Sequence, residues 1–139
     1  MIIVNEAYRY RLYPTIEQKI MFAKTFDCAR FIYNKMLGDR LDYYKETGER
    51  LNNTPAQYKK EFPWLKEVDS LALANAQINL NKAYNNFWSN RKHFGKPSFK
   101  SKKTGYASYS TNNQHGSVRI EGNKVKLPKI GWVKLCLHR

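Results

Sequence analysis

Lysine and arginine side chains gather in the second half of this chain, where acidic residues are nearly missing. Residues 70–139 hold 13 Lys or Arg against one acid, Glu121, and the whole chain carries a formal net charge of +14. Between these cations lie aromatic and amide side chains: Phe94, Phe99, Tyr106, Tyr109, Asn112, Asn113 and Gln114. Cations neutralise phosphates, and aromatic rings stack on bases. The pattern therefore predicts binding to nucleic acid.

The acidic residues give little reason to expect catalysis. Asp39 and Asp42 are three residues apart on an expected helix and could hold a metal ion, but Arg40 and Lys45 beside them favour a solvated face. The three histidines are scattered along the chain, and none has a nearby Ser or Cys in a triad-like context. We therefore expect a binding protein with no metal and no cofactor of its own. A nuclease that uses Asp39 with Asp42, or Glu67 with Asp69, is the minor alternative.

Cysteine content and hydropathy exclude further classes of protein. Cys28 and Cys136 are too few for a disulfide framework or a structural zinc site. No apolar run has the length of a membrane span, and the first ten residues do not resemble a signal peptide. We expect a cytoplasmic protein without membrane contact.

The N-terminal elements begin with an alternating segment. Residues 7–13 predict a strand with Tyr8, Tyr10 and Leu12 on an apolar face and with Arg9 and Arg11 on a basic face. After Pro14, a capping-box pattern starts a helix. We expect a break near residues 26–28 and a second helix over 28–47, which together could form a helix-turn-helix. The first of these helices should bury four apolar side chains: Ile16, Ile20, Ala23 and Phe26.

Two more helices are expected before the lysine-rich region. One is short, over residues 55–62, and the other runs from 70 to about 93 with Asp69 or Ser70 as its cap. An apolar stripe should face the core, formed by Leu73, Ala76, Leu80, Ala83 or Tyr84, and Phe87. The remaining faces are rich in Asn and Gln, which either contact phosphates and base edges or are simply solvated.

The C-terminal region predicts strands. Residues 117–121 and 124–127 flank a Gly122-Asn123 turn, and residues 132–137 begin one more strand. The lone first strand needs partners, and they are available only in this region. We therefore expect an α+β fold in which both chain ends form a small β-sheet or barrel, interrupted by a helical insertion.

Six segments carry a family resemblance. They are YRLYPT (10–15), ARFIYN (29–34), WLKEVDS (64–70), AYNNF (83–87), PSFKSKK (97–103) and LPKIGWVK (127–134). In this order and spacing the chain resembles TnpB (OrfB) proteins, which are accessory transposases of insertion sequences and RNA-guided DNA nucleases related to type V CRISPR effectors.

The resemblance implies an architecture and partners. Residues 1–13 and 96–139 would form an oligonucleotide-binding-like barrel, the wedge domain, and residues 14–95 a helical recognition domain. The partners would be guide RNA, the RNA–DNA hybrid and target-adjacent duplex DNA. The segments around Asn53–Gln57, Ser70 and Thr111-Asn112 would read the duplex. The RuvC nuclease and zinc ribbon of the family would lie beyond residue 134, so we expect this chain itself not to cleave DNA, and the rest of the nuclease is a possible partner.

The predicted contacts with nucleic acid combine the exposed cations with these polar groups. They are Arg9, Arg11, Arg30, Arg40, Asn53, Gln57, Ser70, Gln77, Lys82, Arg91, Lys92, Lys96, Lys100, Lys102, Lys103, Tyr109, Thr111 and Asn112. Tyr109 would stack on a base. Six other rings are expected in the core: Tyr8, Tyr10, Trp64, Phe87, Trp88 and Trp132. The alternative function is a stand-alone helix-turn-helix regulator that binds a two-fold DNA site as a dimer.

Overall fold

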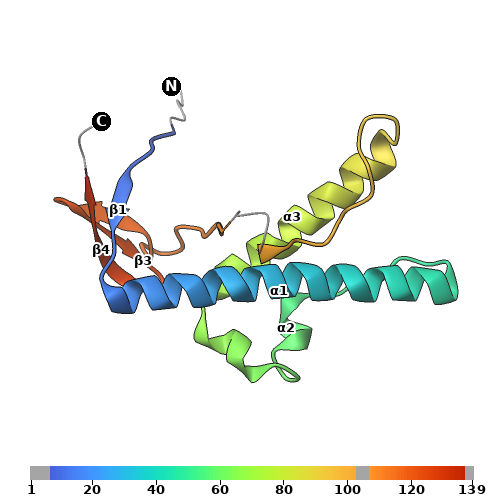
Figure 1. Ribbon diagram of the computed structural model, residues 1–139, viewed down its shortest axis with the longest axis horizontal. Helices are drawn as coiled ribbons and strands as arrows, with labels where there is room; N and C mark the ends of the chain where they lie inside the picture. Colours follow the sequence, from blue (N-terminus) through green and yellow to red (C-terminus); the bar gives the residue numbers. More distant parts are fainter. Residues whose placement is uncertain (1–6, 103–106, 137–139) are drawn as a thin grey trace.

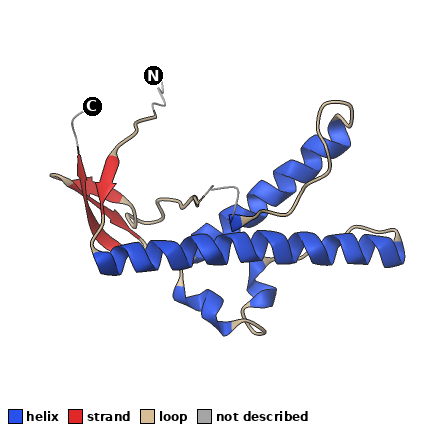
Figure 2. Cartoon of the chain, in the orientation of Figure 1, coloured by secondary structure: helices blue, strands red, loops and turns tan. Residues whose placement is uncertain are grey.

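The computed structural model describes residues 7–102 and 107–136 and has an α+β architecture (Figure 1). The elements run in this order: β1 (Arg11–Tyr13), α1 (Ile16–Thr47), α2 (Pro55–Tyr58), the 3-10 helix η1 (Pro63–Glu67), α3 (Ser70–Ser89), β2 (Arg119–Glu121), β3 (Lys124–Leu127) and β4 (Gly131–Cys136). The strands gather at one end of the molecule, and the helices extend away from them (Figure 2). No helix in the described ranges is long and apolar enough to cross a membrane.

Helix α1 is one continuous helix of 32 residues. Its start is the expected capping box, in which the Gln18 amide N–H donates to Oγ1 of Thr15 at 3.2 Å and the Thr15 N–H donates to Oε1 of Gln18 at 2.9 Å. Gly48 ends it in the left-handed conformation at φ 73°. The predicted break at residues 26–28 is wrong, because residues 15–37 contain no Gly or Pro to interrupt the helix.

The buried face of α1 is not the one expected from its first turns. Ile16 and Ile20 are 77% and 56% exposed, and Ala23 is also exposed. The core face carries Thr25, Cys28, Ala29, Ile32, Tyr33, Met36 and Leu37. Each residue turns a helix by about 100°, so this second set lies on the side opposite Ile16 and Ile20. The predicted burial of Ile16, Ile20 and Ala23 is therefore wrong.

Helix α3 packs along α1 and completes the helical core. Asp69 caps it by accepting a hydrogen bond from the Leu71 N–H at 3.0 Å. Leu73, Ala76 and Leu80 are buried, as the apolar stripe predicts, whereas Ala83, Tyr84 and Phe87 farther along it are half-buried. The helix ends at Ser89 rather than about 93, because Asn90 leaves helical geometry at φ −150° and ψ 79°.

The short connection between α1 and α3 differs from the expected single helix over 55–62. It contains one turn of helix, α2, followed by η1, because Pro63 disfavours helical backbone at Phe62 before it. In η1, Trp64 stays 42% exposed, so its expected place in the core is also wrong. Its ring meets Phe31 and Phe62 at the edge of the helical core.

Both ends of the chain meet in one antiparallel sheet with the strand order β1-β4-β3-β2. The expected hairpin at Gly122-Asn123 joins β2 to β3. Val125, Val133 and Leu135 form a second core with Tyr10 and Leu12. Phe22 of α1 packs against this core, and Nε2 of Gln18 donates to the Trp132 carbonyl at 2.7 Å, which fixes the sheet to the first turns of α1.

The first two strands are shorter than predicted, whereas β3 has the predicted bounds and β4 begins one residue earlier, at Gly131. The first begins at Arg11 rather than residue 7, and Tyr8 is 55% exposed instead of buried. The second begins at Arg119 rather than Ser117, and Leu137 lies outside the described residues. The three remaining rings expected in the core, Phe87, Trp88 and Trp132, are half-buried.

Candidate nucleic-acid interface

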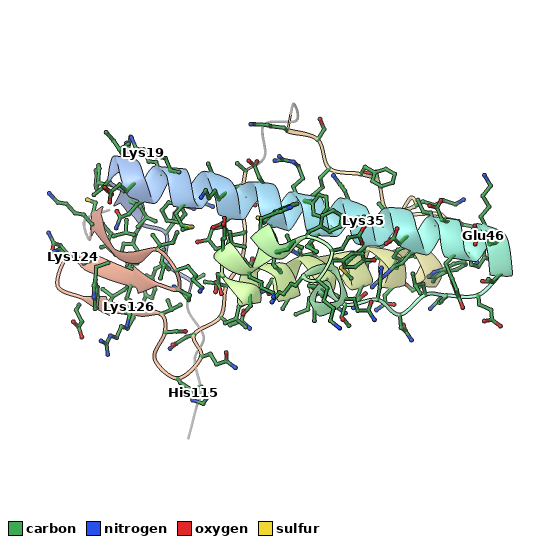
Figure 3. All side chains as sticks on the ribbon, turned by 90° about the horizontal axis from the view of Figure 1, so that it is seen from below. Lys19, Lys35, Glu46, His115, Lys124 and Lys126 are labelled. Atoms are coloured by element: carbon green, nitrogen blue, oxygen red, sulfur yellow. The ribbon has the colours of Figure 1, made fainter. Side chains whose placement is uncertain are left out.

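One face of the sheet is basic and aromatic. Cross-strand partners point to the same face of a sheet, and the pairing sets Tyr13, Lys134, Lys124 and Glu121 in one row. A second row contains Trp132, Lys126 and Arg119, and Arg11 pairs with Cys136 at the edge. Lys124 and Lys126 reach outward at this end of the molecule (Figure 3). The opposite face carries the apolar core of Val125, Val133 and Leu135.

This basic sheet face, made up of Arg11, Tyr13, Arg119, Lys124, Lys126, Trp132 and Lys134, brings like charges together. Lys124 lies opposite Lys134, and Arg119 lies opposite Lys126. Directly opposed like charges destabilise a sheet. The guanidinium of Arg119 also lies 5.5 Å from the centre of the Trp132 ring and 3.7 Å from a Glu121 oxygen. One carboxylate against five cations leaves a surface suited to a polyanion.

A second group of predicted contacts lies at the other end of α1. Arg40, Arg91 and Lys96 line a pocket of about 560 Å³ between α1, the segment 50–52 and α3. Burial lowers the pKa of Arg40, and the guanidinium remains 5.7 Å from the Tyr84 ring centre. In Figure 1 the loop after α3 turns back along this helix toward the middle of α1.

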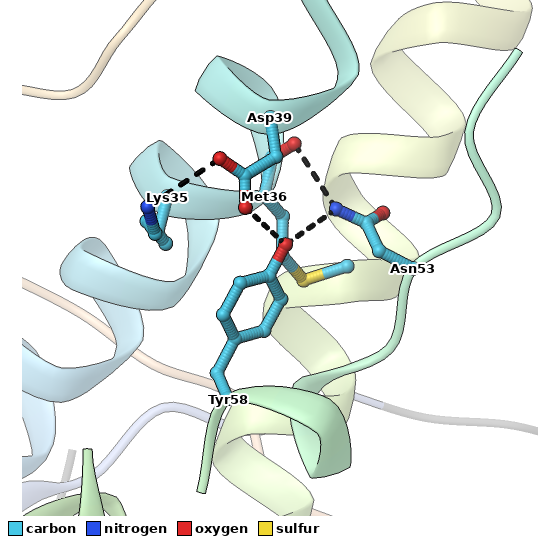
Figure 4. A network of polar contacts seen from close by, with 5 residues as sticks. All are labelled: Lys35, Met36, Asp39, Asn53 and Tyr58. Atoms are coloured by element: carbon cyan, nitrogen blue, oxygen red, sulfur yellow. Dashed lines mark hydrogen bonds and ion pairs between the residues drawn. The ribbon is translucent and has the colours of Figure 1, made fainter. Parts of the chain in front are cut away.

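Asn53 is a structural residue rather than an exposed base reader. It is 3% exposed, and its Nδ2 donates to the hydroxyl of Tyr58 at 2.8 Å and to the Met36 carbonyl at 3.3 Å (Figure 4). Its Oδ1 accepts from Nε of Arg40 at 2.7 Å. The Tyr58 hydroxyl in turn donates to Asp39. Since both ends of the amide are used inside the protein, the direct contact expected at Asn53 is not available here.

The neighbouring amides also serve the fold. Oε1 of Gln57 accepts from the Thr54 N–H at 3.2 Å and caps α2, although the side chain is exposed. Nε2 of Gln77 donates to the Asn53 carbonyl at 3.4 Å. Ser70 is exposed at the first turn of α3. Gln57 and Ser70 therefore remain accessible to a ligand, whereas Gln77 faces the loop that holds Asn53.

Thr111 and Asn112 lie against the N-terminal half of α3. The Thr111 hydroxyl donates to Oδ2 of the buried Asp69, and Nδ2 of Asn75 donates to Oδ1 of Asn112 at 2.9 Å. These bonds hold the segment after residue 107 beside the start of α3. Asn112 is exposed and close to Ser70 along this helix end, so the structure brings together two of the segments expected to read duplex DNA.

Tyr109 faces the protein rather than solvent. Its ring lies 5.7 Å from Phe26 and 6.2 Å from Phe22 between ring centres. Burial, with the nearby charge of Asp69, raises the pKa of Tyr109 to about 12. The ring is half-buried against α1, and the base stacking that we expected of it stays a prediction.

Two predicted cations contact side chains of α1. Arg30 donates to Asp27 at 2.8 Å, one turn earlier on α1. Lys100 exchanges two backbone hydrogen bonds with the Asn34 side chain and places its ammonium 4.4 Å from the Tyr33 ring centre. These contacts anchor the loop after α3 to the middle of α1. Arg30 and Arg40 are half-buried, whereas Lys100 and seven other predicted cations within the described residues are exposed: Arg9, Arg11, Lys82, Arg91, Lys92, Lys96 and Lys102. Lys103 lies outside the described residues.

Three of the four acids considered for catalysis bond or pair with neighbouring side chains, and the fourth, Asp42, is exposed on α1. Asp39 accepts from Tyr58 at 2.7 Å and lies 3.4 Å from Lys35, and Glu67 lies 3.8 Å from Lys24. Asp69 caps α3 and bonds Thr111. Within residues 7–102 and 107–136, no group of three or more His, Cys, Asp and Glu is placed to hold a metal ion.

The basic sheet face contains residues that the sequence reasoning missed. Among the predicted contacts only Arg11 lies on the basic sheet face, while Arg119, Lys124, Lys126 and Lys134 were left out. Their signal was present as alternation, because residues 124–126 and 132–134 place Lys or Trp at every second position. Arg50, which lines the pocket, was also missed, because it follows a helix end in an acidic stretch that gives no such signal.

Comparisons with known proteins identify the family of this chain. Residues 1–49 match the model of a helix-turn-helix domain of OrfB proteins of the IS605 type. In these residues the structure places β1 and the single helix α1. The virulence protein VsdF of Salmonella dublin is 33% identical over 107 residues, which are 66% of this chain and 88% of that protein.

Two further relatives carry the name "Putative RNA-guided DNA endonuclease". The one from Streptomyces pristinaespiralis is 35% identical over 76% of this chain, and InsQ from Escherichia coli K12 is 27% identical over 93% of it. This chain spans 27% and 33% of their respective lengths. The chain belongs to the OrfB/TnpB family of insertion-sequence proteins and corresponds to their N-terminal portion.

Proposed function

We propose that this chain is the nucleic-acid-binding N-terminal region of an RNA-guided DNA endonuclease, and that it binds guide RNA, the RNA–DNA hybrid and target-adjacent duplex DNA. The observation that carries the proposal is the basic sheet face, where five cations and two aromatic rings share one side of four strands. The names of the two endonuclease relatives support the choice of partners. Binding belongs to this chain in the proposal, and cleavage belongs to the RuvC nuclease domain that the family resemblance implies.

Physical chemistry favours a nucleic-acid backbone on this sheet face. Phosphates along a strand would relieve the repulsion between Lys124 and Lys134 and release counterions as they bind. Tyr13 and Trp132 are spaced among the cations and offer flat surfaces for bases or riboses. We propose that the sheet is one wall of an oligonucleotide-binding-like barrel formed by residues 1–13 and 96–139, with 14–95 as the recognition domain.

Duplex reading is proposed at the start of α3. Ser70 and Asn112 are exposed there, and Gln57 is exposed on α2. Amides and hydroxyls at such positions donate to and accept from base edges in a groove. Asn53 and Thr111 support this surface from within, through Arg40 and Asp69 respectively.

The test compares three ligands over a salt series by fluorescence anisotropy: structured RNA from the 3′ region of the gene itself, duplex DNA and single-stranded DNA. We expect RNA to bind most tightly and to persist at the highest salt. The triple variant Lys124→Gln/Lys126→Gln/Lys134→Gln should lower the slope of log K against log salt by about two to three, since each phosphate contact contributes about 0.9.

The matched control is Lys59→Gln/Lys60→Gln/Lys66→Gln, which removes the same charge from the segment between α2 and α3. Equal losses in the two triple variants would contradict a defined interface on the sheet. Preference for one duplex sequence, with RNA bound no better than other polyanions, would instead support the alternative of a stand-alone helix-turn-helix regulator.

A further inference from the structure

We propose that the pocket at the far end of α1 binds one unstacked nucleotide of a single strand, with its phosphate between Arg50 and Arg91. The inference rests on the proposed nucleic-acid function and adds a second site to it. The pocket lies between the C-terminal half of α1, the segment 50–52 and the second half of α3. The basic sheet face is at the opposite end of α1, as the positions of Lys124 and Glu46 in Figure 3 show.

Two guanidinium groups are held on one aromatic ring. The guanidinium carbon of Arg50 lies 4.9 Å from the centre of the Trp88 ring, and that of Arg91 lies 4.5 Å from the same centre. Arg91 also lies 5.6 Å from the Phe87 ring centre. The two charges are therefore less than about 10 Å apart, which is within one Debye length at ordinary salt. Their contacts with the rings fix them in place while leaving their N–H groups available as donors.

No carboxylate balances this pair of charges inside the pocket. Every described residue that lines it is neutral or basic, and neither Arg50 nor Arg91 forms an ion pair with an acid of the described ranges. Glu46 and Glu49 lie at the same end of α1 but do not line the pocket. An anion of the ligand is the natural partner for the two arginines.

The rest of the lining fits a base better than a bare phosphate. The volume of about 560 Å³ is in the range of small-molecule sites, about 300–1,000 Å³. Tyr44 and Tyr84 supply aromatic surface, and Asn81 and Asn85 supply amides. Rings stack on base faces, and amides pair with base edges. A phosphate alone would need neither.

The pocket also selects against duplex. A base can enter a space between two helices only when it is out of the stack, and unstacking costs least in a single strand. The proposed ligand is therefore a nucleotide within single-stranded RNA or DNA, and the shared chemistry is a phosphate with an adjoining base.

The test follows the indole N–H signal of Trp88 by nuclear magnetic resonance in the nitrogen-15-labelled chain, with Trp88→Phe to assign it. The probes are a tetranucleotide as RNA, the same sequence as DNA, a nucleoside monophosphate, inorganic phosphate and an oligoglutamate of equal charge. We expect saturable shifts of the Trp88 signal with the single strands and weaker ones with the monophosphate. A preference between the RNA and DNA probes would show whether the nucleotide in the pocket comes from RNA or from DNA.

Arg50→Gln/Arg91→Gln should weaken tetranucleotide binding at least about tenfold, since each charged hydrogen bond lost costs about that factor. Both arginines are exposed, so the variant should keep its circular dichroism melt. The control Lys60→Gln/Lys66→Gln removes the same charge elsewhere and should change binding less than about twofold.

The inference is overturned if oligoglutamate or phosphate moves the Trp88 signal as far as the tetranucleotide does, or if the arginine variant binds the tetranucleotide as tightly as its control does. The sheet-face variant separates the two proposals. If it loses structured RNA while the Trp88 response to tetranucleotide persists, both proposals are supported. If structured RNA depends on the sheet face but the Trp88 signal never moves, the proposed function stands and the pocket inference fails.

Discussion

Arg40 and Asn53 are joined by a hydrogen bond of 2.7 Å from the guanidinium Nε to the amide oxygen. The bond connects α1 to the segment that leads into α2, and it places a cation at the edge of the pocket through a residue that is 3% exposed. A buried amide therefore positions a charged group that a ligand would meet.

Removing this amide should destabilise the protein. Asn53→Ala deletes bonds to Arg40, Met36 and Tyr58 in a buried region, so we expect a cost of about 2–3 kcal/mol. Urea unfolding measures the change. Asn52→Ala, at an exposed neighbour, should stay within about 0.5 kcal/mol. Equal effects at the two positions would rule out a structural role for Asn53.

Alkaline pH should lower the folding stability of the protein through Tyr58, whose hydroxyl bonds Asn53. Burial, and next the hydrogen bond to Asp39, raise the pKa of Tyr58 from 10.0 to about 12. Because the folded state holds this proton more tightly than the unfolded chain, its stabilisation is complete below pH 10.0 and is lost as the pH rises to about 12. The unfolding free energy of the wild type should therefore fall more steeply over this interval than that of Tyr58→Phe. Parallel curves would contradict the shift.

The cap of α3 should be coupled to the segment that crosses it. Asp69 binds the Leu71 N–H through one oxygen and the Thr111 hydroxyl through the other. We expect Asp69→Ala to cost about 1–2 kcal/mol, in line with other helix caps. A double-mutant cycle with Thr111→Val should show a coupling energy of at least about 0.5 kcal/mol. Ser70→Ala is the neutral control, and additive effects of Asp69→Ala and Thr111→Val would argue against the bond.

The like charges on the basic sheet face should lower the folding stability of the protein and raise its affinity for RNA. Lys134→Glu places a carboxylate opposite Lys124, so at low salt the sheet should gain about 0.5 kcal/mol and melt at a higher temperature. Affinity for structured RNA should fall in the same variant. Lys60→Glu makes the same change of charge far from the sheet and should affect neither quantity comparably. A Lys134→Glu protein with a lower melting temperature would refute the repulsion between the two lysines.

The exposed face of α1 should tolerate polar residues. Ile16→Gln and Ile20→Gln should each change the unfolding free energy by less than about 0.5 kcal/mol, since both side chains are mostly in solvent. Ile32→Ala, on the buried face, should cost about 2–5 kcal/mol. A large loss at Ile16 would mean that this face packs against something in solution.

Local signals predicted much of the fold. These signals depend on residues that are at most four positions apart, and the structure contains each of them. They are the capping box of Thr15 and Gln18, the cap at Asp69, the stripe from Leu73 to Leu80 and the turn at Gly122-Asn123. The need of a lone first strand for partners also predicted that β1 pairs with a C-terminal strand.

Long-range choices were harder to predict. Ile16 and Ile20 have helical spacing, yet the sheet and α3 pack against a different side of α1. Helical spacing alone does not indicate which side of a helix its neighbours will cover. The sequence also does not indicate whether a polar residue is exposed. The amides Asn53, Gln77 and Asn112 look alike in the sequence, but in the fold Asn53 is buried and bonds several neighbours. For the site, charge density pointed to the loops, while the strand alternation that marks the sheet face is weak in segments of three to six residues.

The uninterrupted α1 acts as a spacer. Gln18 binds the sheet near its first turn, and Arg40 and Tyr44 reach the pocket near its last turns. At about 1.5 Å per residue, the helix separates these two surfaces by roughly 35 Å. A strand in a helical stack advances about 3.4 Å per nucleotide, so roughly ten steps are needed to touch both ends. The length of one helix thus sets the minimum length of a fully stacked strand that touches both surfaces, and a strand that is unstacked and extended between them needs fewer nucleotides.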